Sequence, residues 1–184
     1  PSAVLDISFK LDNAYEEENY RTIEMTLFAR KTEDAGEYED RNWRDSYETA
    51  PWQETFEVTV TNITENNTKK SQGSINGIDL SGLDSGESYD FLLKGPQHLQ
   101  VKKTIEILEL SNSLDFGVLL AGDIASAGVS GGDNRIGTRD ISHWLNEWSP
   151  LADIDSLADL DGNGRVNGRD HSFVSRHWGQ KGDD

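Results

Sequence analysis

The sequence predicts a mixed fold: an antiparallel β-sandwich followed by a small α-helical unit of two loop–helix repeats. Through the first two thirds of the 184 residues, apolar side chains alternate with polar ones. After residue 121, two Asp- and Gly-rich loops each lead into apolar residues at helical spacing. Alternation gives a strand one buried face, whereas spacing of three or four residues gives a helix one apolar stripe. We therefore predict a sandwich domain over 1–119 and a helical domain over 120–184.

Six segments show the strand pattern, and turn-rich spacers separate them. Six or more short strands joined in this way favour an antiparallel sandwich. The residues predicted to face inward are Leu5, Ile7, Phe9 and Leu11; Ile23, Met25 and Leu27; Phe56, Val58 and Val60; Tyr89, Phe91 and Leu93; Ile105 and Ile107; and Leu114, Phe116 and Val118.

Glycines divide the stretch at residues 74–99 into short strands. Gly82, Gly86 and the Gly95-Pro96 pair stand where tight turns are expected. The sequence GLDSGESYDF resembles the "GL-x-x-G-x-Y-x-F" turn of prealbumin-like and carboxypeptidase-regulatory-like sandwiches. The resemblance implies a sandwich of that type, or an immunoglobulin-like one.

The two predicted helices are ISHWLNEW at 141–148 and HSFVSRHW at 171–178. In the first, Ile141, Trp144, Leu145 and Trp148 fall on one apolar stripe. The junction LDFGVLLAGD before the first loop is mostly apolar and contains no Pro/Ser/Gly-rich linker. We therefore expect the sandwich and the helical unit to pack together.

The sequence DLDGNGRVNGRD at residues 159–170 has the spacing of an EF-hand calcium loop. Calcium takes six to eight oxygen ligands at about 2.3–2.6 Å, so a short loop must wrap around the ion. Gly164 permits the sharp turn in the middle, and Val166 is expected to pack inward. The predicted ligands are the side chains of Asp159, Asp161, Asn163 and Asp170, the backbone carbonyl of Arg165, and Asn167 directly or through water.

A second candidate loop, DIASAGVSGGDNRIGTRD, spans residues 123–140 and carries six extra residues between its first and fifth ligand positions. Lengthening a flexible loop costs only about 0.6 kcal/mol per doubling, so the insertion is tolerable. The predicted ligands are Asp123, Asp133, Asp140 and the carbonyl of Arg135, with Ser126 or a backbone carbonyl at the third position and a bridging water at Gly137. We expect a second Ca²⁺ here, bound with reduced affinity.

Charge and composition exclude several functions. The chain has 34 acidic and 17 basic residues, a net charge of −17, which disfavours nucleic acid and anionic membrane surfaces as partners. It has no cysteine, and its four histidines lack an accompanying Ser or Cys motif and the spacing of a zinc site. No run of about 18 apolar residues is present. We expect a protein that is not an enzyme.

Two calcium loops, each followed but not preceded by a helix and each ending in Asp, resemble those of dockerins. The resemblance covers residues 122–184 and depends on GDNRIGTRDISHWLNEW and ADLDGNGRVNGRDHSFVSRHW. It implies two Ca²⁺ ions, a cohesin-type protein partner and an extracellular or cell-surface location in a cellulosome-like assembly. The sandwich in front resembles the X-module that precedes some dockerins. Because the sequence opens PSAVLDISF, we expect a fragment of a larger secreted protein.

The resemblance also implies a partner-binding face. In dockerins the tenth and eleventh loop positions, and a position further along each helix, contact the cohesin. Thr-Arg and Gly-Arg stand here in place of the usual Ser/Thr pairs, so the partner is expected to differ from well-known cohesins. The matching positions are Thr138, Arg139 and Asn146 in the first repeat and Gly168, Arg169 and Arg176 in the second.

Two other functions remain open from the sequence. Aromatic residues stand among acids at Tyr38, Trp43, Tyr47 and Trp52. On a sandwich loop such rings can stack on sugar rings, which would give polysaccharide contact; more often they cap an end of the sandwich or pack against a neighbouring domain. Alternatively, calcium stabilises a spacer module that has no partner. A sugar-binding module is distinguished from an adhesion module by the loss of polysaccharide retention when Trp43 or Trp52 is changed. A spacer is distinguished from both by the absence of any binding partner.

Overall fold

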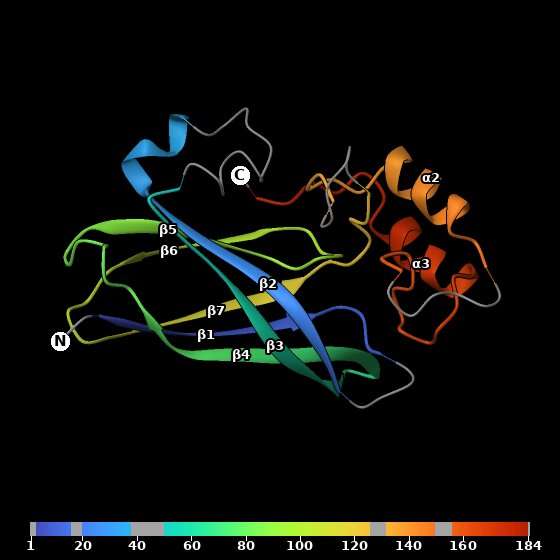
Figure 1. Cartoon of the computed structure of the whole chain (residues 1–184), viewed down its shortest axis with the longest axis horizontal. Helices are drawn as coiled ribbons and strands as arrows, with labels where there is room; N and C mark the ends of the chain where they lie inside the picture. Colours follow the sequence, from blue (N-terminus) through green and yellow to red (C-terminus); the bar gives the residue numbers. More distant parts are fainter. Residues whose placement is uncertain (1–2, 16–19, 38–49, 126–131, 150–155, 184) are drawn as a thin grey trace.

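The computed structural model describes residues 3–15, 20–37, 50–125, 132–149 and 156–183. Figure 1 shows a curved sheet with two short helices gathered at one end of it. Within the described residues no helix is long and apolar enough to cross a membrane. The elements are β1 (Val4–Leu11), β2 (Tyr20–Lys31), the 3-10 helix η1 (Thr32–Glu37), β3 (Trp52–Glu65), β4 (Thr68–Asp79), β5 (Ser88–Lys94), β6 (Val101–Glu106), β7 (Ser111–Leu119), α2 (Thr138–Asn146) and α3 (Gly168–Arg176).

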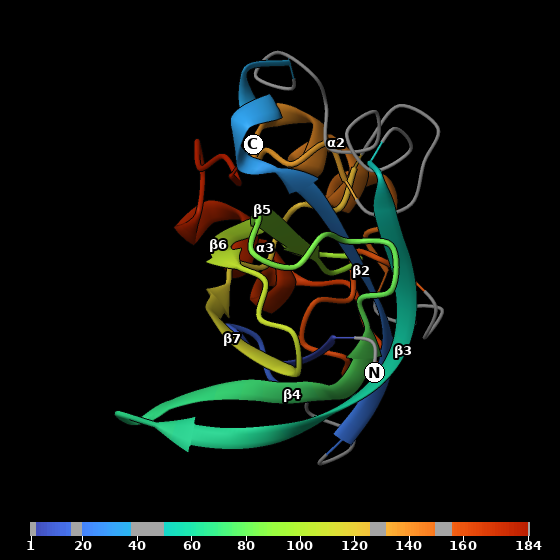
Figure 2. The same cartoon turned by 90° about the vertical axis from the view of Figure 1, so that its left-hand side faces the viewer.

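The described strands form one seven-stranded sheet in the order β6-β5-β2-β3-β4-β1-β7. Figure 2 shows the sheet curling around its core so that the edge strands β6 and β7, which contact one another, lie side by side. The β-rich architecture is therefore confirmed. Two details of the predicted antiparallel sandwich are wrong: the sheet is continuous, and β1 pairs with β7 in parallel.

The alternating apolar residues fill the space inside this curl, as their spacing predicts. Leu5, Ile7, Phe9 and Leu11 of β1 pack in one buried cluster with the inward residues of β2, β3, β5 and β7. Phe56 and Ile105 lie at its margin, partly buried. Trp52 also packs there, edge-on to Phe91 with ring centroids 6.4 Å apart. That contact gives Trp52 a structural role, while Tyr38, Trp43 and Tyr47 lie outside the described residues.

Strand β4 was not predicted, because its sequence TKKSQGSINGID lacks apolar alternation. It forms by hairpin pairing with β3 through Asn66 and Asn67, both in the left-handed region with φ of +50° and +61°. Two consecutive left-handed residues make the tight turn that matches the twist of paired strands, and asparagine tolerates this conformation better than most residues. The hairpin turn sets the pairing, and Ile78 with the partly buried Ile75 supplies the apolar contacts of this strand with the core.

Val118 was predicted to face inward with Leu114 and Phe116, and this is wrong. Gly117 has φ +72°, and the β1–β7 register shifts between Ser8 and Lys10. The resulting bulge changes the phase of alternation, so Leu119 takes the buried position and Val118 is only half-buried. A single irregular residue is enough to displace the pattern for the rest of a strand.

The helices begin three residues earlier than predicted, at Thr138 and Gly168. Asp140 and Asp170 each accept a hydrogen bond from the backbone N–H of the cap residue, Gly137 and Asn167, at 2.7 and 2.8 Å. Such bonds satisfy N–H groups at a helix start and fix where it begins. The loop carboxylates thus double as helix-capping groups.

A second buried cluster lies under the helices. It contains Leu99, Ala121, Ile124, Ile136, Trp144, Ala158, Leu160, Val166 and Val174. Trp144 and Val174 are the single fully buried apolar positions of α2 and α3, and Val166 packs inward as expected. The predicted apolar stripe of α2 is only partly correct, because Leu145 and Trp148 are more than half exposed.

Polar contacts join the sheet to the helical unit, as the apolar junction predicts. Leu99, beyond the end of β5, packs in the second cluster. The Asn13 side chain donates to the Leu160 carbonyl at 2.8 Å and lies 2.8 Å from Nε2 of His98. Arg176 of α3 donates to Asp12 at 2.9 Å. Asp12, Asn13 and His98 are buried, whereas Arg176 is exposed, so the two parts share one interior around the first three residues.

The C-terminal residues also return to the sheet. The backbone N–H of Gly182 donates to the Asn134 carbonyl at 3.0 Å, and that of Asp183 donates to the Gln100 carbonyl at 3.0 Å. The Asp183 carboxylate accepts a bond from the backbone N–H of Lys102 at 2.8 Å. This segment therefore connects the first loop with the edge strand β6.

Candidate metal centre

Three carboxylates of the 159–170 loop meet beneath the start of α3. One oxygen from each of Asp159, Asp161 and Asp170 lies within 4.8 Å of the other two. The three side chains are only 1%, 5% and 0% exposed. Buried acids normally pair with cations or bind metals, because an uncompensated buried charge is expensive. Among the described residues this is the cluster of acids with metal-ligand spacing.

Backbone N–H groups hold the first carboxylate of the loop in place. Oδ1 of Asp159 accepts a bond from Asn163 at 3.1 Å, and Oδ2 accepts one from Gly164 at 2.9 Å. Burial raises the pKa of Asp159; the Gly164 N–H opposes that rise, and the charge of Asp170 adds to it. The carboxylate is thus oriented by the loop while a second negative charge acts on it.

The last carboxylate joins the two ends of the loop. Oδ1 of Asp170 accepts bonds from the backbone N–H groups of Leu160 and Asp161, at 2.8 and 3.2 Å. Its Oδ2 accepts the bond from Asn167 that caps α3. One side chain therefore fixes the loop entrance and the helix start together.

An unpaired oxygen supports a metal at this position. Oδ1 of Asn163, the predicted fifth-position ligand, is buried and finds no hydrogen-bond partner among the described residues. The Nδ2 of the same amide donates to Asp161 at 2.9 Å, which fixes its orientation. A buried polar oxygen without a partner is costly. Three carboxylates and one free amide oxygen form the hard, oxygen-only donor set that Ca²⁺ prefers, so these residues fit the ion.

The other two predicted ligands have distinct positions. Arg165 extends its side chain to solvent, which leaves its carbonyl as the group available to the loop. Asn167 uses its side-chain oxygen to accept a bond from Arg169 at 2.9 Å, as the N-cap of α3. If Asn167 binds the ion, the same side chain acts both as a ligand and as the cap of α3.

Glycine is favoured at two positions of the 159–170 loop. Gly164 has φ +71°, in agreement with the sharp turn expected there. Gly162 has φ +60°, and a Cβ there would in addition lie 2.7 Å from Cδ1 of Tyr15. We expect Gly162→Ala to lower the free energy of unfolding by at least about 1–2 kcal/mol, the cost of a left-handed residue with a side chain. Gly168→Ala is the matched control, because Gly168 has open space around it. Equal urea midpoints for the two variants would contradict this expectation.

The first loop repeats the backbone pattern of the second. Oδ1 of Asp140 accepts bonds from Ile124 and Ala125, at 2.8 and 3.0 Å, as Asp170 does from Leu160 and Asp161. Burial raises the pKa of Asp140, and the N–H groups of Gly137 and Ile124 oppose that rise. The two repeats are thus alike at their last ligand position.

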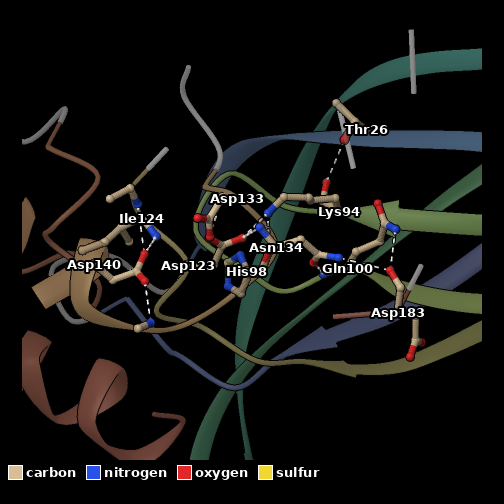
Figure 3. A network of polar contacts seen from close by, with 12 residues as sticks. Thr26, Lys94, His98, Gln100, Asp123, Ile124, Asp133, Asn134, Asp140 and Asp183 are labelled. Atoms are coloured by element: carbon tan, nitrogen blue, oxygen red, sulfur yellow. Dashed lines mark hydrogen bonds and ion pairs between the residues drawn. The ribbon is translucent and has the colours of Figure 1, made fainter. Parts of the chain in front are cut away.

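At the first ligand position the repeats differ. Asp123 is fully buried, and its oxygens accept bonds from the backbone N–H groups of Asp133 and Asn134, both at 2.9 Å. Figure 3 shows Lys94 extending from the end of β5 to the same carboxylate, with Nζ 2.7 Å from Oδ2. Burial raises the pKa of Asp123 to about 6, against the attraction of Lys94. Burial also lowers the pKa of Lys94, against the charge of Asp123.

The remaining first-loop residues are less clustered. The carboxylate of Asp133 forms an ion pair with Arg139 at 3.0 Å. Arg135 is exposed and forms a backbone bridge with Lys181. Ser126, the candidate for the third position, lies outside the described residues. The structure therefore brings Asp123, Asp133 and Asp140 into one loop without the close three-carboxylate grouping found at 159–170.

All six positions of the predicted partner-binding face are exposed: Thr138, Arg139, Asn146, Gly168, Arg169 and Arg176. Arginines of this face also have contacts within the chain. Arg139 pairs with Asp133, and Arg176 pairs with Asp12 while its guanidinium lies 5.0 Å from the Phe173 ring centroid. Arg169, Phe173 and Arg176 line a cleft of about 680 Å³ between α3 and the β3–β4 hairpin.

Sequence reasoning missed the buried polar residues that support the loops. Lys94 belongs to β5, a strand buried on both faces, so the period-two rule gives no warning that its side chain points inward. His98 is also fully buried, which lowers its pKa to about 3 and keeps the ring neutral. His177 lies between the Ala121 carbonyl and Asp12. In the sequence, the sign of a special role for Lys94 is that this charged residue directly follows the apolar residues 91–93.

No protein-family model matches the sequence. No curated protein matches it either. Among solved structures, the chain is similar to one chain in the crystal structure of an N-terminal interface mutant of a type II Cohesin-X-Dockerin complex from Acetivibrio cellulolyticus, with a TM-score of 0.54 and 14% sequence identity. The match covers 96% of each chain, so the related fold includes the sheet and the helical unit together.

Proposed function

We propose that this chain is a calcium-dependent, non-catalytic adhesion module that attaches its parent protein to a cohesin-type partner in an extracellular complex. The observation that carries the proposal is the grouping of Asp159, Asp161 and Asp170 with the unpaired amide oxygen of Asn163 at the start of α3. The similarity to a chain of a cohesin–X-dockerin complex supports it at the level of the fold.

Calcium binding links the loop to the helix. Two unit charges 4 Å apart repel by about 4 kcal/mol at an effective dielectric constant of 20, so three clustered carboxylates oppose loop closure. A divalent ion removes that repulsion and adds bonds to oxygen. Because Asp170 is both a proposed ligand and a capping group of α3, ion binding stabilises the helix start. The exposed residues of α3 are thereby held in one orientation.

The partner is expected to contact the exposed loop ends and helices. Arg169 and Gly168 lie at the start of α3, next to the proposed ion, and Thr138 and Arg139 occupy the same positions in α2. These residues are all exposed. Binding of the partner should therefore depend on calcium through the 159–170 loop.

The test is binding to a panel of purified cohesin modules of different types, in excess Ca²⁺ and in excess EDTA. We expect at least one cohesin to bind in Ca²⁺, with binding lost in EDTA and restored by added Ca²⁺. Equal affinity in both conditions would overturn the calcium mechanism. Binding to no cohesin, together with a calcium-raised melting temperature, would instead indicate a structural spacer. Retention on polysaccharide independent of Ca²⁺ would indicate a sugar-binding module.

Reversing one charge on the proposed face tests where the partner binds. We expect Arg169→Glu to weaken cohesin binding by at least ten-fold, since hot-spot side chains contribute about 2 kcal/mol or more. Lys103→Glu, on the exposed side of β6, carries the same charge change and should have little effect. Comparable losses in both variants, measured by titration calorimetry in Ca²⁺, would show that net charge rather than this face decides binding.

A further inference from the structure

The two loops end alike but differ in what lies against their first carboxylate. Asp159 and Asp123 each accept two backbone N–H bonds from the middle of their own loop. Asp123 has in addition a cation in direct contact, the Lys94 ammonium, 2.7 Å from Oδ2, whereas the charge of Arg21 acts on Asp159. That pair is 1% and 0% exposed. The first loop thus receives a positive charge from the sheet.

The surroundings of this ammonium are those of a cation site. Nζ of Lys94 donates to a carboxylate oxygen of Asp123 and, at 2.6 Å, to the carbonyl of His98. Carboxylate and carbonyl oxygens are also the donors that Ca²⁺ uses. Figure 3 shows Lys94, His98 and Asp123 together behind the loop, with Asp140 bound separately to Ile124.

The balance of charge also differs between the loops. Lys94 and Arg139 bring two positive charges to the three acids Asp123, Asp133 and Asp140. In the 159–170 loop, by contrast, one carboxylate oxygen from each of Asp159, Asp161 and Asp170 lies within 4.8 Å of the other two. A carboxylate already paired with a buried ammonium gains less from a divalent ion, because that ion must displace or coexist with the first cation.

We propose that Lys94 supplies the cation of the first loop, so that this loop is closed without calcium and the chain binds one Ca²⁺ rather than two. The inference rests on the proposed function for the 159–170 site. It assigns different tasks to the helices: α2 stays fixed to the sheet through Asp123 and Lys94, and α3 is the element that responds to calcium.

The first experiment counts ions on the whole chain by native mass spectrometry with saturating Ca²⁺, for the wild type and for Asp161→Ala, which removes the side-chain oxygens that an Asn would keep. One ion on the wild type and none on the variant supports the proposal. Two ions on the wild type would overturn it while leaving the proposed calcium site intact. One ion that Asp161→Ala retains would place calcium in the first loop and overturn both.

Hydrogen exchange in EDTA tests the first loop independently of ion counting. The backbone N–H groups of Asp133 and Asn134 should remain protected in EDTA, because Asp123 still accepts them. Those of Asn163 and Gly164 should exchange at least ten-fold faster in EDTA than in Ca²⁺. Fast exchange at both pairs in EDTA would overturn the role of Lys94. If the wild type binds no ion but Asp133 and Asn134 stay protected, the proposed function fails and the role of Lys94 stands.

A variant identifies the lysine as the cause. Lys94→Met should lose the protection of Asp133 and Asn134 in EDTA, whereas Lys103→Met, an exposed lysine of β6, should keep it. Protection in the Lys94→Met variant equal to the wild type would contradict the proposal. If Lys94→Met does not fold, the ion count and the exchange pattern of the wild-type chain still test the proposal.

Discussion

Replacing Asp161 with Ala is expected to abolish the rise in melting temperature that calcium causes in the wild-type chain. The change removes the side-chain oxygens together with one of the three charges that meet within 4.8 Å, whereas an Asn would keep an oxygen ligand. An ion present at 100 times its dissociation constant stabilises the folded state by about 2.7 kcal/mol. For a domain of this size that corresponds to a rise of roughly 5–11 °C. Differential scanning calorimetry in Ca²⁺ and in EDTA measures the difference.

Asp115→Ala provides the control for this prediction. Asp115 is exposed in β7 and accepts one backbone bond, from Gly117 at 2.9 Å, so it shares the charge change and the local bonding without the cluster. The control should keep the full calcium effect. If Asp161→Ala also keeps it, the ion binds elsewhere and the assignment of the 159–170 loop fails.

The largest loss of stability is expected from Lys94→Met. Methionine fills most of the volume but leaves the Asp123 carboxylate buried without its ammonium partner. Breaking a buried ion pair in this way costs about 3–5 kcal/mol, far more than a surface pair is worth. The melting temperature should fall by roughly 6–20 °C. Urea unfolding in EDTA measures the free energy of unfolding of both chains without any contribution from bound calcium.

Two further variants make the test specific. Lys103→Met removes an exposed lysine and should change the free energy of unfolding by less than about 0.5 kcal/mol. Adding Asp123→Asn to Lys94→Met removes the orphaned charge and should recover part of the loss. A loss of stability in the double variant equal to or larger than the sum of the two single losses would show that Lys94 and Asp123 do not act as a pair.

Local patterns were sufficient to predict most of the strands. Leu5, Ile7, Phe9 and Leu11 are buried because a strand exposes alternate residues to opposite sides, and no tertiary information is needed to expect that. The same rule failed wherever burial is not alternating. Strand β4 has Ile75 and Ile78 as its apolar residues and pairs through its hairpin, and β5 is buried on both faces.

The candidate metal centre was predictable for a different reason. A loop that wraps around an ion must supply oxygens at fixed intervals along the chain, so Asp159, Asp161 and Asp170 are recognisable from spacing alone. Lys94 and Asp123 are 29 positions apart, and their pairing depends on how the sheet meets the loop. No rule based on spacing contains that information. Contacts between distant elements therefore account for most of what the sequence left undetermined.

The parallel pairing of β1 with β7 has a consequence for mechanical resistance. The pairing is bracketed by bonds from Val4 to the Leu110 carbonyl and from Asp12 to the Leu119 carbonyl, both at 3.2 Å. Tension applied at the start of β1 and transmitted through the helical unit after β7 pulls these neighbours past each other along their length. Their hydrogen bonds must then rupture together instead of opening one by one. If the chain attaches its parent protein as proposed, such an arrangement would strengthen that attachment under flow or drag, whichever ions its loops contain.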